Sequence, residues 1–78
     1  MTPKEAMELA LELAKQEKNL LFAMNDAHMA YQVCGLTPAV EGLMQDIMQR
    51  AAVQADPFSL SSAALMYQKM LNAEYDIA

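Results

Sequence analysis

Apolar residues in the first 34 positions recur at intervals of three and four, the spacing that places them on one side of an α-helix. Gly35 follows, a residue type that commonly ends helices. Residues 15–19 interrupt the pattern with a run of polar side chains. We expect one long helix from Pro3 to Cys34, with a bend or break near Asn19 as the alternative. Its predicted buried stripe is Leu9, Leu13, Leu20, Met24, Ala27, Tyr31 and Cys34.

Three dipeptides mark helix starts: Thr2-Pro3, Thr37-Pro38 and Asp56-Pro57. In each, a side-chain oxygen can accept hydrogen bonds from the first turn, and proline fits the first helical position. Glu5 lies three residues after Thr2, the spacing of a capping box. The sequence therefore predicts three helices, over Pro3–Cys34, Pro38–Ala55 and Pro57–Tyr75.

The second and third predicted helices differ in how much apolar surface they carry. In the second, one face is apolar, and Asp46 and Arg50 are spaced for a weak surface ion pair. The third has two adjacent apolar faces, more than a three-helix core can cover. The expected inward residues of the second helix are Val40, Leu43, Met44, Ile47 and Ala51. The third helix has a main stripe of Leu60, Ala64, Tyr67, Leu71 and Tyr75, and beside it Ala63, Met66, Met70 and Ile77.

The pattern favours an all-α fold. Sustained alternation of apolar and polar residues is missing, and β-branched residues are few. With 78 residues, the chain is too short for a second core, so residues 1–78 are expected to be a single helical domain. Because the predicted connections are short, we expect a small three-helix bundle in which the long first helix packs against a hairpin of the two shorter ones.

Charge and composition narrow the classes of partner. Ten acidic against five basic residues give a net charge of −5, which opposes binding to nucleic acids and anionic membranes. The most apolar run, residues 20–24, is far shorter than a membrane-spanning helix. No secretory signal is visible at the N-terminus. We expect a cytoplasmic protein without a membrane span, with export by another route left open.

Residues able to support catalysis or metal binding are sparse. Cys34 is the only cysteine, so an intrachain disulfide and a four-thiolate zinc site are excluded. The metal-binding Glu-x-x-His motif of helical bundles, phosphate-binding glycine loops and serine nucleophile elbows are absent from the sequence. We therefore expect a non-enzyme without a cofactor. A small metal or ligand carrier using Met24, His28 and Cys34 is kept as an alternative.

Methionine is over-represented, with eight residues in the chain. Its flexible, polarisable side chain adapts to irregular partner surfaces, although it also fills gaps in small cores. Together with the excess apolar surface, the methionines indicate a protein-protein interaction module, either a homo-oligomer or an adaptor or chaperone-like partner. The alternative is a structural subunit of a polymer or secretion apparatus. The predicted contact residues are Met44, Ile47, Met48, Met66, Tyr67, Met70 and Leu71.

The C-terminal segment carries a family resemblance. Asp56-Pro57, then Leu60 and Tyr67-Gln-Lys-Met-Leu-Asn-Ala-Glu-Tyr75, resemble the second helix of type III secretion needle and inner-rod proteins. Those proteins are short helical hairpins whose second helix often follows an Asn/Asp-Pro turn and carries Tyr-Gln and Glu-Tyr pairs. The resemblance covers residues 56–78 alone. It implies a small structural subunit of a secretion apparatus or a chaperone associated with one.

Overall fold

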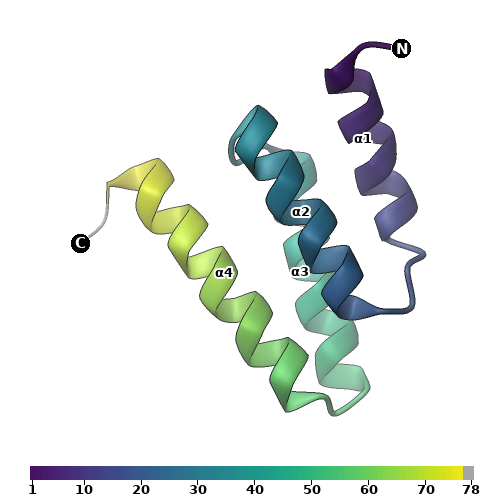
Figure 1. Cartoon of the computed structure of the whole chain (residues 1–78). Helices are drawn as coiled ribbons and strands as arrows, with labels where there is room; N and C mark the ends of the chain where they lie inside the picture. Colours follow the sequence, from purple (N-terminus) through teal and green to yellow (C-terminus); the bar gives the residue numbers. More distant parts are fainter. Residues whose placement is uncertain (77–78) are drawn as a thin grey trace.

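The structure, a computed structural model, describes residues 1–76, and these form four α-helices and no strands (Figure 1). The predicted all-α class is confirmed. The predicted three-helix bundle is wrong, because its long first helix is two separate helices. Ile77, expected on the third predicted helix, lies outside the described residues. The helices are α1 (Pro3–Ala14), α2 (Leu20–Cys34), α3 (Pro38–Val53) and α4 (Pro57–Tyr75).

The chain turns sharply between α1 and α2. The Asn19 side chain accepts hydrogen bonds from the backbone N–H groups of Leu21, at 3.0 Å, and Phe22, at 3.3 Å. Asparagine competes in this way with helix continuation, because its side chain caps a new first turn. The break near Asn19 is therefore what the structure contains, and α2 runs back antiparallel to α1 (Figure 1).

This turn also changes which face of α1 is buried. Leu11 and Ala14 enter the core, and Met7 packs against it. Leu9 and Leu13, predicted to be buried, are 46% and 58% exposed. The prediction assumed continuous helical rotation through residues 15–19, and the turn resets that rotation. In α2, where the rotation restarts, the predicted residues Leu20, Met24 and Ala27 are buried, and Tyr31 and Cys34 are half-buried.

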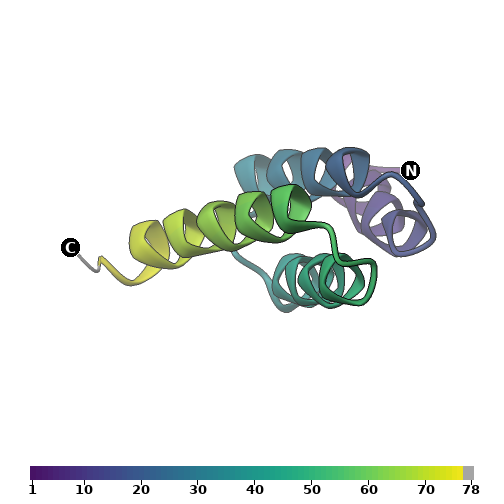
Figure 2. The same ribbon diagram turned by 90° about the horizontal axis from the view of Figure 1, so that it is seen from below.

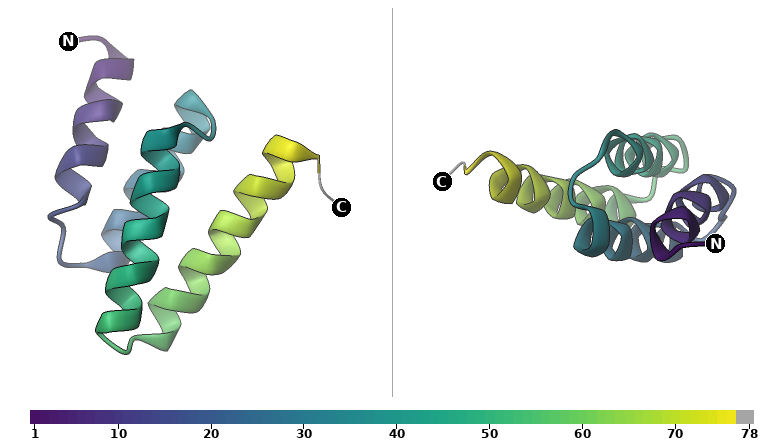
Figure 3. Two further views of the ribbon diagram at one scale, coloured as in Figure 1. Left: turned by 180° about the vertical axis from the view of Figure 1, so that it is seen from behind. Right: turned by 90° about the horizontal axis from the view of Figure 1, so that it is seen from above.

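Helix α3 is the centre of the molecule and contacts the other three helices. Figures 2 and 3 show α2 and α4 side by side, with α3 packed across them. All five inward residues predicted for this segment are fully buried: Val40, Leu43, Met44, Ile47 and Ala51. The core is therefore built around one helix that its three neighbours share.

Helix α4 packs on α3 through the apolar face that the sequence analysis placed beside the expected main stripe. Ser59, Ala63 and Met70 are buried, whereas Leu60 and Tyr75 of the expected main stripe are 37% and 60% exposed. The expectation about the main stripe is therefore wrong. Apolar periodicity identified both faces of this helix but not the one that α3 covers.

The predicted helix starts are confirmed. Thr2 and Glu5 form the capping box, with hydrogen bonds of 3.0 and 3.1 Å. Thr37 accepts a hydrogen bond from the Val40 N–H, and Asp56 accepts from the Ser59 N–H and hydroxyl. After α2, Gly35 takes a positive φ of 79°. Local cap chemistry thus fixes three of the four helix starts as the sequence indicated.

Arg50 of α3 caps the C-terminal end of α1. Its Nη1 donates a hydrogen bond to the Glu17 carbonyl, and its Nη2 donates to the Ala14 carbonyl at 3.3 Å. Asp46 lies 3.0 Å from the same Nη2. Because α1 has no basic residue in its own last turn, a guanidinium from another helix supplies the positive charge that favours a helix C-terminus. The sequence predicted only the pair with Asp46.

Replacing Arg50 by alanine should lower the free energy of unfolding by about 1.5–3 kcal/mol, because hydrogen bonds from a charged donor to two carbonyls are lost. Urea unfolding followed by circular dichroism measures this. Gln49→Ala, at an exposed neighbouring position, is the control and should change stability by less than about 0.5 kcal/mol. Equal effects of the two substitutions would contradict the capping role.

The turn between α3 and α4 places an alanine in the left-handed region. Ala55 has a φ of 53°, and the Asp56 N–H bonds to the Ala51 carbonyl at 2.9 Å. This is the hydrogen bond of a Schellman helix end, where glycine is preferred because it has no Cβ.

Ala55→Gly should therefore raise the free energy of unfolding by up to about 1 kcal/mol, because glycine relieves the strain of the left-handed conformation. Ala64→Gly is the matched control at an exposed position inside α4, and should lower stability by about 0.5–1 kcal/mol. Thermal and urea unfolding of both variants test the sign. A loss of stability in both would show that residue 55 does not carry this strain.

Stability should fall in acid because two helix caps use carboxylates. Hydrogen bonds from Ser59 lower the pKa of Asp56, and those from Thr2 lower the pKa of Glu5. The folded state thus binds protons less readily than the unfolded chain, so the stabilisation is present above about pH 4 and is lost as the pH falls through the depressed values. Asp56→Asn keeps a cap acceptor without the charge, and should make unfolding midpoints less dependent on pH between about 2 and 5. An unchanged pH profile would exclude this role of Asp56.

Candidate functional site

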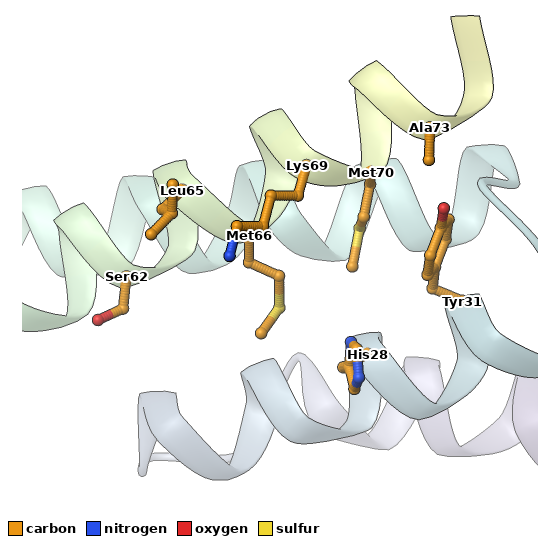
Figure 4. Close-up of a pocket in the computed structure, with 8 residues that line it drawn as sticks. All are labelled: His28, Tyr31, Ser62, Leu65, Met66, Lys69, Met70 and Ala73. Atoms are coloured by element: carbon orange, nitrogen blue, oxygen red, sulfur yellow. The ribbon is translucent and has the colours of Figure 1, made fainter. Parts of the chain in front are cut away.

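A groove lies between α2 and α4. The two helices run in the same direction and spread apart toward their C-terminal ends (Figure 1). The space between them has a volume of about 480 Å³. Figure 4 shows the side chains of Met66 and Met70 pointing from α4 toward α2, opposite His28 and Tyr31. The lining residues are His28, Tyr31, Ser62, Leu65, Met66, Lys69, Met70 and Ala73.

The sizes of the side chains along α4 favour this divergence. Ser59 and Ala63, in the N-terminal half, are small and buried, and so allow α4 to approach its neighbours closely. Met66 and Met70 follow one and two turns later and are much larger. Because α3 already fills its own side of the interface, these methionines occupy the space toward α2 and hold the helices apart.

The groove combines an apolar lining with a local excess of positive charge. Leu65, Met66 and Met70 supply apolar surface, Lys69 supplies the positive charge, and His28 adds the nitrogen atoms of its ring. Among the described residues that line it, none is acidic, although the whole chain carries a net charge of −5. Such a site suits an apolar ligand surface whose flanks are negatively charged.

The predicted contact residues are only partly gathered here. Met66, half-buried, and Met70, 2% exposed, line the groove. Met44 and Ile47 have no exposed surface, because the neighbours of α3 enclose them, so they cannot contact a partner in this fold. Met48, Tyr67 and Leu71 are half-buried and lie outside the groove lining.

Sequence reasoning missed several groove residues. Leu65 and Lys69 share one side of α4 with Ser62 and Ala73, at helical spacings of three and four. This periodicity marks a helix side but does not show which helix it faces. His28 of α2, which the sequence analysis assigned to an alternative metal or ligand carrier, also contributes to the groove.

The residues proposed for a metal or ligand carrier are not brought together. Met24 is buried in the core, Cys34 is half-buried near the start of α3, and His28 is exposed toward the groove. Within residues 1–76, no cluster of three or more histidine, cysteine, aspartate or glutamate side chains could hold a metal ion.

Large apolar side chains are exposed on other faces as well. Leu9 and Leu13 lie on α1, and Phe22, which is 63% exposed, lies on α2. Phe58 and Leu65, 64% and 59% exposed, lie one heptad apart on α4, so they extend the apolar margin of the groove toward the start of that helix. The fold therefore leaves apolar surface uncovered, most of it on helix faces rather than at isolated positions.

Within residues 1–76, no helix combines the length and apolar character needed to cross a bilayer. Comparisons with protein-family models, with curated proteins and with solved structures find no match to this chain. They therefore give no support to the resemblance to type III secretion proteins, and the geometry of the groove carries the functional argument.

Proposed function

We propose that this chain is a non-catalytic protein-binding module whose groove between α2 and α4 receives an apolar helical segment. The observation that carries the proposal is the groove itself, about 480 Å³ in volume and lined largely by apolar side chains, of which Leu65 is 59% exposed. Grooves between helices that are lined by methionines suit the apolar face of an amphipathic helix, because methionine adapts its shape to the partner.

The dimensions of the groove fit a helix of about three turns. On α4, the lining extends from Ser62 to Ala73, which at 1.5 Å per residue corresponds to about 16 Å. A partner helix would present apolar residues at spacings of three, four and seven over that length. Burial of the exposed part of Leu65 and of the margin at Phe58 would provide the driving force, at about 25 cal/mol for each Å² removed from water.

Replacing Met66 and Met70 together by lysine is a poor test, because Met70 belongs to the core and its loss would destabilise the fold. Leu65→Lys is better, because this side chain is 59% exposed. It should weaken partner binding at least tenfold, or about 1.4 kcal/mol. Val53→Lys, at a 76% exposed position away from the groove, is the matched control and should leave binding unchanged.

Photo-crosslinking captures the bound species even when the identity of the partner is unknown. Benzoylphenylalanine at Ser62, in the groove, should give one discrete adduct in native extract, and Leu65→Lys should abolish it. The same probe at Ser61, whose hydroxyl bonds to the Pro57 carbonyl outside the groove, should give none. Equal adducts at the two positions, or none at Ser62, would overturn the proposed function.

A further inference from the structure

We infer that the segment bound in the groove is helix α1 of a second copy of this chain, an inference that rests on the proposed function. The outer face of α1 has the chemistry that the groove requires. Leu9 and Leu13 are 46% and 58% exposed and lie one turn apart. Glu5 and Glu12 lie four residues before and three after Leu9, so they flank it on the helix surface, and both are exposed.

The charges of the two surfaces are complementary. The outer face of α1 carries glutamates at positions 5, 8 and 12, whereas the described lining of the groove carries Lys69 and His28 and no acidic residue. Lys69 is also the only basic residue in the sequence after Arg50. The ion pair of Glu12 with Lys15 is 3.4 Å long and exposed. Such a pair is weak, so it does not prevent Glu12 from pairing with Lys69 of another copy.

The other exposed helix face fits the groove less well. On α2, Phe22, Met29 and Val33 lie along one outer stripe. Beside that stripe lie the amides Asn25 and Gln32 and a single carboxylate, Asp26, which is half-buried against α1 of its own chain, whereas α1 offers three exposed glutamates. The acidic and apolar character of α1 therefore selects it over α2 as the segment that the groove receives.

The length and the position of α1 also agree with binding in the groove of another copy. The twelve residues of α1 span about 18 Å, close to the length of the groove along α4. Figure 1 shows α1 and α4 at opposite edges of the molecule, and these two helices make no contact in the described chain. A copy cannot fill its own groove with its own α1, because α1 and α4 lie at opposite edges of the molecule. The contact is thus head to tail, and it continues into a chain or closes into a ring.

Two variants that block one surface each provide the test. Leu13→Lys removes the α1 face and leaves the groove, and Leu65→Lys removes the groove face and leaves α1. Both side chains are more than half exposed, so the helical content should match the wild type by circular dichroism. Light scattering over a concentration series should show growing assemblies for the wild type and a constant mass near 8.6 kDa for each variant alone.

An equimolar mixture of the two variants should form a one-to-one dimer and nothing larger, because a single intact α1 face and a single intact groove remain to pair. Lys69→Glu in the groove partner should weaken that dimer at least fivefold. Assemblies of either variant alone, a mixture that stays monomeric, or a dimer indifferent to Lys69→Glu would each overturn the inference. Loss of assembly in Phe22→Lys but not in Leu13→Lys would overturn it in favour of α2.

The crosslinking result separates this inference from the proposed function. A discrete Ser62 adduct with a different protein, together with a wild type that remains monomeric at all concentrations, would reject the second copy and keep the binding groove. An adduct whose mass is that of two copies supports both. The absence of any Ser62 adduct, with a monomeric wild type, rejects both.

Discussion

The burial of one face of α3 is the interaction on which the rest of the structure depends. Val40, Leu43, Met44 and Ile47 are completely enclosed, and all three other helices pack on this one element, although α1 packs more extensively on α2. A small domain has little apolar area to distribute, so α4 is held mainly by α3, α2 is held by α1 and α3, and α2 and α4 touch one another less extensively. The groove between them follows from that arrangement, because two helices attached to a common third are free to diverge.

The sequence predicted the parts of this fold that are encoded locally. Helix starts at Thr2, Thr37 and Asp56 depend on atoms within three residues of each other, and the buried face of α3 is a simple periodic stripe. The end of α1 is different. From the sequence alone, Asn19 is equally compatible with a polar position inside a continuous helix. The guanidinium that caps the end of α1 comes from Arg50, more than thirty positions later in the chain. A contact between residues so far apart in the sequence produces no periodic pattern from which it could be predicted.

The candidate site was predictable only in part for a related reason. Met66 and Met70 belonged to one of the two apolar faces predicted for the α4 segment, and both line the groove although Met70 also belongs to the core. His28 and Lys69 could not be assigned to it, since their proximity depends on how far α4 tilts from α2. That tilt depends on how the small side chains of Ser59 and Ala63 and the large ones of Met66 and Met70 pack against two neighbouring helices. It is therefore a property of the tertiary packing and not of one helix. Periodicity along one helix identifies its sides but not their neighbours.

The common direction of α2 and α4 gives the groove between them an electrical axis. Peptide dipoles in both helices add, so the amide-rich ends that begin at Asn19 and Asp56 lie together (Figure 1), and the carbonyl-rich ends lie together at the opposite pole, where the helices are farthest apart. Helices α1 and α3 both run the other way, so the axis belongs to the groove and not to the molecule as a whole. A helix bound in the groove, as proposed above, would be favoured antiparallel to α2 and α4, with its own positive terminus toward the wide end. Every further copy bound in this way would keep the same polarity.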